Sequence, residues 1–268
     1  MARNRTRYLS ACLAGLSATL LCLLSLTGCL RPQPSPPTTA PTEPAAPTLP
    51  YDGLQFTYNE QGFLTGEDIP CIPGIDVSSF QGKIDWPVVK AAGVEFAMIR
   101  LGYRSYKDGL LHTDPRAEEN LRGAKAAGLK IGAYFFSQAT SADQAQEEAQ
   151  YALAILGDTV LDLPLAFDWE YVSADVPSAQ VTPAVLEQCV RRFCDTVEAA
   201  GYESMIYFNQ DLAKTRLDLD ALKEYPFWLA RYEDTLTFSH ALRLWQYSDQ
   251  GQVPGIEGNV DLDLYFPE

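Results

Sequence analysis

Two carboxylates separated by one residue, Asp168 and Glu170, are the clearest chemical feature of the sequence. They follow an apolar run at 163–167, where an isolated charge is costly to bury. If a strand continues through Glu170, both side chains point to one side, about 6–7 Å apart at Cβ. Like charges at that range raise at least one pKa. A carboxyl that stays protonated near neutral pH can donate a proton to a leaving-group oxygen.

This pairing is what glycoside hydrolysis requires, but the pair alone is open to other interpretations. Carboxylate pairs also bind Mg²⁺ or Ca²⁺, and a single Asp can cap the next segment. Asp76, Asp261 and Asp263 also stand in apolar runs, so the sequence offers several carboxylates that one site could gather. No CxxC motif or His/Cys spacing typical of zinc occurs, and the chain has two His. We therefore expect no metal and no cofactor.

The elements that must position these carboxylates alternate between apolar runs and helical segments from residue 71 onward. Continuous apolar runs are typical of strands buried on both faces of a parallel sheet. Helices are expected to begin at Asp85, Asp114-Pro115, Ser141 and Thr182-Pro183. The expected strands cover 74–78, 95–101, 130–136, 163–168, 204–208, 227–231, 242–247 and 259–264.

This alternation predicts an α/β fold, an irregular single-domain (β/α) barrel of about eight mostly parallel strands with fewer than eight helices. A regular barrel typically takes about 250 residues, more than the chain provides after residue 71. In such barrels the active site forms at the carboxyl ends of the strands. The site should therefore gather Asp76, Asp168 and Glu170, which stand at expected strand ends, and Asp261 and Asp263 lie in the last expected strand.

Seven segments in order along the chain resemble the glycoside hydrolase family 25 lysozymes, the Chalaropsis-type muramidases. The resemblance runs from about residue 71 to the C-terminus. The segments are GIDVSSFQGKIDW (74–86), EFAMIRLGY (95–103), GLKIGAYFFS (128–137), LPLAFDWE (163–170), FWLARY (227–232), LWQYS (244–248) and GNVDLDLYF (258–266).

The resemblance implies a role for each of the four carboxylates. Glu170 matches the general acid, and Asp168 matches the residue that positions or stabilises the acetamido group of the sugar. Asp76 and Asp261 match the first-strand and last-strand carboxylates of the cleft. The family cuts the β-1,4 bond between N-acetylmuramic acid and N-acetylglucosamine in peptidoglycan. Two alternatives stay open: another N-acetylated glycan such as chito-oligomers, or a non-catalytic tethered glycan-binding protein, which would be expected to lack the acid.

Aromatic and amide residues near the strand ends are candidates for binding sugar, whose C–H faces stack on rings. Trp228, Trp245 and Tyr247 fit either the cleft or the core. Arg100 and Arg231 are expected to pair with cleft acids. Phe135 stands where family members often carry His, which implies one polar contact fewer. The predicted substrate-binding residues are Tyr134, Trp169, Tyr207, Arg231 and Gln246.

The first fifty residues are expected to be a signal and a spacer rather than part of the fold. A basic start, an apolar run over 9–26 and the tetrapeptide Leu-Thr-Gly-Cys29 resemble a bacterial lipobox. A plain transmembrane anchor is the alternative. Residues 31–50 contain eight Pro, which favours an extended spacer. We expect a signal peptide at 1–28, a lipidated Cys29 and spacer at 29–50, a lead-in hairpin or strand at 51–70 and a catalytic domain at 71–268.

Charge and cysteine content restrict the partners. Loss of residues 1–28 would lower the formal net charge from −15 to −18, which disfavours nucleic acid and anionic lipid surfaces. Three Cys remain beyond Cys29, so no complete disulfide framework follows. Cys71 either pairs with Cys189 or Cys194, or all three are small buried apolar residues. We expect an extracytoplasmic monomer that is tethered to the membrane through Cys29 and acts on peptidoglycan strands.

Overall fold

The computed structural model describes residues 49–267. The expectations for the signal peptide, for Cys29 and for nearly all of the spacer lie outside the described residues. Within them, no helix combines the length and the apolar character needed to cross a bilayer.

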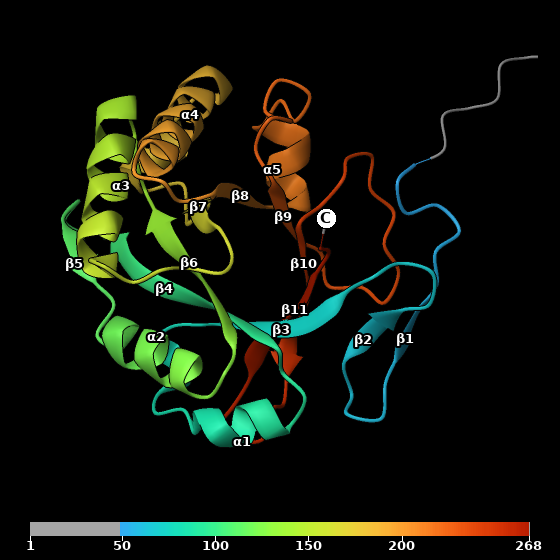
Figure 1. Cartoon of the computed structure of the whole chain (residues 1–268). Coiled ribbons are helices and arrows are strands. Elements are labelled where there is room, and N and C mark those ends of the chain that lie inside the picture. Colours follow the sequence, from blue (N-terminus) through green and yellow to red (C-terminus); the bar gives the residue numbers. More distant parts are fainter. Residues whose placement is uncertain (1–48, 268) are drawn as a thin grey trace, which may run out of the picture. The chain divides into compact units, whose positions relative to one another are not determined.

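Eight strands close into a barrel, with helices on its outside (Figure 1). Seven of these strands run parallel to one another, and the last strand runs antiparallel to the two strands beside it. The expected fold class, an irregular and mostly parallel barrel, is confirmed. In barrel order the strands are β3 (Ile72–Val77), β4 (Phe96–Arg104), β6 (Lys130–Ser137), β7 (Leu165–Trp169), β8 (Ser204–Asn209), β9 (Phe227–Ala230), β10 (Leu244–Gly251) and β11 (Val260–Tyr265).

Five α-helices are found among the described residues, and all five precede β9 in the chain (Figure 1). Asp85, Ser141 and Thr182 cap their helices through side-chain oxygens, as the sequence predicts. The helices are α1 (Trp86–Ala91), α2 (Ala117–Ala126), α3 (Ala142–Leu156), α4 (Pro183–Ala199) and α5 (Gln210–Thr215), with short 3₁₀ turns η1 (Ser79–Gln81) and η2 (Pro177–Gln180).

The second helix begins later than the Asp114-Pro115 pattern predicts, and the reason is local. The N-cap of α2 is Arg116, two residues after Asp114, and both oxygens of Asp114 accept hydrogen bonds. One oxygen accepts from the backbone N–H of Arg116, and the other accepts from Ser79 N and Arg100 Nε. The strand β5 (Leu111–Thr113), which pairs antiparallel with β4, and the helix α5 are further elements that the sequence analysis did not predict.

Residues 51–70 form the expected hairpin, with β1 (Phe56–Tyr58) antiparallel to β2 (Leu64–Gly66). The hairpin packs against β10: the ring centroids of Phe56 and Trp245 lie 5.2 Å apart, and Leu64 N donates to Tyr247 Oη. It therefore covers part of the barrel wall on which the described chain places no helix (Figure 1).

Side chains alternate along the strands between two apolar groups. The larger group fills the space between the strands and the helices, and the smaller group fills the barrel interior. Cys189 and Cys194 are buried in the larger group, and Cys71 accepts a hydrogen bond from Gly66 N. All three thiols are free, so the disulfide alternative is not formed.

Candidate active site

The four predicted carboxylates meet at one end of the barrel. Asp76 lies near the carboxyl end of β3, and Asp168 lies near the carboxyl end of β7. Because β11 runs antiparallel to β3, Asp261 near its start stands opposite Asp76. They line a hollow of about 240 Å³, whose residues are Asp76, Phe80, Arg100, Tyr134, Phe136, Asp168, Glu170, Tyr207, Trp228, Tyr232, Gln246 and Asp261.

Asp168 and Glu170 form a carboxyl pair in which each group influences the pKa of the other. Burial raises the pKa of Asp168 well above its usual range, the charge of Glu170 raises it further, and the Arg100 guanidinium opposes the rise. Burial also raises the pKa of Glu170. Asp168 is 4 % exposed, whereas Glu170 is only partly buried. The pair therefore retains a proton to higher pH than free carboxyls do, and Glu170 is the member that opens to the hollow.

Asp76 anchors a hydrogen-bonded group on the opposite wall. Gln246 Nε2 donates to Asp76 Oδ2 over 2.6 Å, and Gln246 Oε1 accepts from the hydroxyls of Tyr207 and Tyr232, each over 3.1 Å. Burial and the nearby charge of Asp261 raise the pKa of Asp76. Since each polar group of Gln246 has a partner, its amide holds the wall in a defined orientation.

The last strand contributes two carboxyls at different depths. Burial, then the charges of Asp249 and Glu170, raise the pKa of Asp261 to about 6. Asp263 lies two residues further along β11, hence deeper in the barrel, and is fully buried. Trp228 Nε1 donates to Asp263 Oδ1 over 2.8 Å. Asp263 thus supports the floor of the hollow rather than lining it.

Aromatic rings form the floor of the hollow. The ring of Trp228 contacts those of Tyr134 and Tyr207 edge to face, with centroids 5.9 and 4.9 Å away. Tyr134, Tyr207 and Gln246 therefore lie where the sequence predicts. The sequence left open whether Trp228 belongs to the cleft or to the core. The structure shows both, because Trp228 is 1 % exposed and still lines the hollow.

Trp169 does not lie in the hollow, so its predicted place was wrong. It alternates with Asp168 on β7 and points into the outer apolar group, where Nε1 donates to Ala139 O over 3.2 Å. The same alternation on β10 turns Trp245 and Tyr247 away from the interior, on either side of Gln246.

Arg231 also lies outside the hollow. It follows Ala230, which faces the interior, so its side chain turns outward. There Nη2 pairs with Glu233 over 2.7 Å and Nη1 donates to Thr237 O over 2.5 Å. The prediction that Arg231 pairs with cleft acids was wrong.

Arg100 lines the hollow, but its ion pair is with Asp114, over 2.8 Å, rather than with a cleft acid. Phe135 faces the outer apolar group, where its ring centroid lies 6.3 Å from that of Tyr151. A histidine at position 135 would not face the hollow, so the expected loss of a polar cleft contact does not follow.

Three ring-bearing residues of the hollow were missed by the sequence analysis: Phe80, Phe136 and Tyr232. Phe80 lies in η1 just after β3 and is 83 % exposed, with the Arg100 guanidinium 4.8 Å from its ring centroid. An aromatic residue in the turn that follows Asp76 was the available signal. The sequence gives a weaker indication for Tyr232, because this residue lies after β9 in a segment without regular secondary structure.

A family model and two known proteins that match the chain all indicate the same family. The family model for glycosyl hydrolases family 25 matches residues 75–256. The autolytic lysozyme of Clostridium acetobutylicum is 33 % identical over 193 residues, which cover 72 % of this chain and 55 % of that protein. Lysozyme M1 of Streptomyces globisporus is 28 % identical, with 85 % of each chain covered. The chain thus spans about half the length of the clostridial relative.

Solved structures share the fold. The modular autolysin LytC of Streptococcus pneumoniae, in complex with a synthetic peptidoglycan ligand, superposes with a TM-score of 0.66 at 26 % identity. That match covers 80 % of this chain and 51 % of LytC. The bacterial lysozyme of Streptomyces coelicolor superposes with a TM-score of 0.63 at 27 % identity, covering 75 % of this chain and 94 % of the lysozyme.

Proposed function

The chain belongs to glycosyl hydrolase family 25, and from this premise we propose that it is a lysozyme-type muramidase. Its substrate is the β-1,4 bond between N-acetylmuramic acid and N-acetylglucosamine in peptidoglycan. The observation that carries the proposal is the Asp168–Glu170 pair at the open end of the barrel, in which burial raises both pKa values.

In this proposal Glu170 protonates the oxygen that bridges the two sugars, which makes the departing sugar a neutral alcohol. Burial raises the pKa of Glu170, which favours its protonated form over a wider pH range than that of a free carboxyl. Asp168 lies beside it and assists, by orienting the acetamido group of the sugar and by stabilising the positive charge that develops at the anomeric carbon. A water molecule completes the hydrolysis.

The opposite wall of the hollow has the chemistry to hold an amino sugar. Asp76 and Asp261 offer carboxyl oxygens to hydroxyl and amide N–H groups. The exposed rings of Phe80 and Tyr232 offer surfaces on which the C–H face of a sugar can stack. The complex of LytC with a synthetic peptidoglycan ligand supports the same substrate.

Digestion of purified peptidoglycan and of chito-oligomers, with mass analysis of the new reducing ends, tests the assignment. We expect reducing N-acetylmuramic acid ends from peptidoglycan and little product from chito-oligomers. Reducing N-acetylglucosamine ends, or faster cleavage of the chito-oligomers, would assign the hollow to another glycan. Glu170→Gln serves as the control for contaminating hydrolases.

We also propose that the enzyme works as a monomer outside the cytoplasmic membrane, tethered by lipid on Cys29. The lipobox-like tetrapeptide before Cys29 and the Pro-rich segment after it support this location. Expression of the full chain and of Cys29→Ser, followed by membrane fractionation and intact mass, tests the tether. We expect a diacylglycerol mass and membrane retention that the variant lacks; equal membrane retention would contradict lipidation.

A further inference from the structure

The backbone of Glu170 lies just beyond the last pair of residues that join β6 to β7 in the sheet. The last paired residues of β6 and β7 are Ser137 and Trp169, so the sheet ladder ends one residue before Glu170. The backbone carbonyl of Glu170 instead accepts a hydrogen bond from Gln138 Nε2 over 2.9 Å. The position of the acid therefore depends on a side chain from the neighbouring strand end.

The Gln138 amide has a partner for each of its polar groups. Nε2 donates to the carbonyls of Ser137 and Glu170, and Oε1 accepts from Ser178 Oγ over 2.5 Å. Gln138 and Ser178 are both buried. Turning the amide over would set its oxygen against two carbonyl oxygens, so the orientation that reaches Glu170 is fixed.

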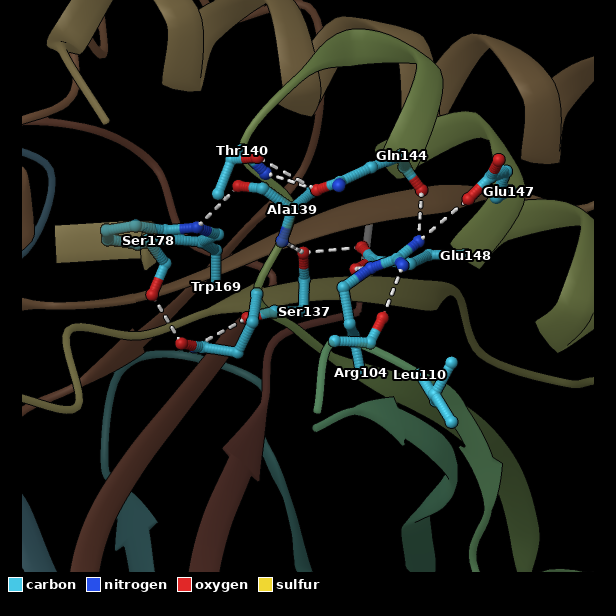
Figure 2. A network of polar contacts seen from close by, with 12 residues as sticks. Arg104, Leu110, Ser137, Ala139, Thr140, Gln144, Glu147, Glu148, Trp169 and Ser178 are labelled. Carbon is cyan, nitrogen blue, oxygen red and sulfur yellow. Dashed lines mark hydrogen bonds and ion pairs between the residues drawn. The ribbon is translucent and has the colours of Figure 1, made fainter. Parts of the chain in front are cut away.

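The turn that carries Gln138 is held in place from α3. Ser137 Oγ donates to Glu148 Oε2 over 2.5 Å. Arg104 Nε donates to the other oxygen of Glu148 over 2.7 Å. Figure 2 shows Ser137 and Glu148 at this turn, with Arg104 on one side and Ser178 on the other. The helix α3 is thus connected to the backbone of Glu170 through the buried side chains of Glu148, Ser137 and Gln138.

We propose that Gln138 is a positioning residue for the proton donor: it holds the backbone of Glu170 so that the carboxyl stays beside Asp168 and faces the hollow. The inference rests on the proposed function, since it assigns Gln138 a part in the same reaction. Gln138 does not line the hollow, so it acts through Glu170 and not on substrate. A displacement of about 1 Å at a reacting group can cost on the order of 100-fold in rate.

Gln138→Met tests the inference, because Met has a similar length and lacks both the donor and the acceptor. We expect kcat on peptidoglycan to fall about 10- to 100-fold with little change in KM. We also expect the alkaline limb of the pH–rate profile to move to lower pH. A Glu170 that drifts toward solvent loses part of the burial that raises its pKa, and so loses its proton earlier.

Gln144→Met is the matched control. Gln144 lies near the same turn and accepts hydrogen bonds from Thr140, but it does not contact Glu170. We expect its kcat and pH–rate profile to match those of the wild type. Should Gln138→Met fail to fold, Ser178→Ala removes only the hydrogen bond that orients the amide. It is expected to lower kcat less and to shift the profile in the same direction.

An unchanged kcat and alkaline limb in Gln138→Met, or in Ser178→Ala if that variant must be used, overturns the inference. The inference is also overturned if Gln138→Met and Gln144→Met lose the same fraction of kcat and neither shifts the alkaline limb of its pH–rate profile. Such a result would indicate a general loosening of the turn. The wild type is measured in the same digest. A wild type that releases no reducing ends refutes the proposed function, whereas an active wild type with an unaffected Gln138→Met refutes the positioning role alone.

Discussion

Replacing Glu148 by Gln is expected to leave the stability of the protein nearly unchanged at pH 4.5 and to raise it at pH 8. Glu148 is the buried carboxylate of α3 that holds the turn before the active site, and its side chain is 0 % exposed. Burial raises its pKa from the usual 4.5 to about 7, although Ser137 and Arg104 oppose the rise by hydrogen bonding to the charged form. Desolvation therefore outweighs the ion pair.

The size of the effect follows from proton linkage. Between pH 4.5 and 7 the folded protein keeps the proton on Glu148, whereas the unfolded chain releases it. The stabilisation is therefore fully present below pH 4.5 and is lost as the pH rises through 7. A difference of about 2.5 pKa units corresponds to about 3 kcal/mol in the free energy of unfolding. Glutamine resembles the neutral carboxyl at every pH and does not incur this loss.

Urea denaturation followed by circular dichroism at pH 4.5, 6 and 8 measures the difference between Glu148→Gln and the wild type. Glu147→Gln is the control: its side chain is 62 % exposed and also contacts Arg104, so we expect changes below about 0.5 kcal/mol at every pH. If the ion pair with Arg104 outweighed desolvation, Glu148→Gln would be less stable at pH 8 by about 3–5 kcal/mol, and the reasoning would be refuted.

Two further predictions concern the charges around the acid. Asp168→Asn is expected to lower the initial rate of reducing-end release, but less than Glu170→Gln does, because the proton donor remains; a rate equal to the wild type would remove Asp168 from the mechanism. Arg231→Met is expected to leave the pH–rate profile unchanged, since the guanidinium contacts Glu233 and Thr237 O and no cleft acid. A shifted profile would show a coupling that this geometry does not contain.

The barrel and its carboxylates could be predicted because both depend on local pattern. Apolar runs of five to seven residues marked the strands, and carboxylates inside such runs marked the open end of the barrel. The direction of β11 could not be predicted, since an apolar run carries no direction. Asp261 reaches the site because β11 enters the sheet antiparallel, so that its first residues lie beside the end of β3.

The errors at the site come from two sources. Trp169 and Arg231 could have been excluded, because each is one residue out of phase with an inward-facing neighbour and a strand alternates with period two. Gln138 could not have been found from its surroundings in the sequence. Its partners are the carbonyl of Glu170, 32 residues away, and the hydroxyl of Ser178, 40 residues away.

The most direct test of the proposed mechanism compares Glu170→Gln with the wild type in two assays on the same purified peptidoglycan. One counts new reducing ends, and the other measures binding of the protein to the insoluble glycan. We predict that the variant folds, binds like the wild type and releases no reducing ends, because an amide has no proton to donate to the bridging oxygen. Turnover by Glu170→Gln at the wild-type rate would contradict the assignment of Glu170 as the proton donor.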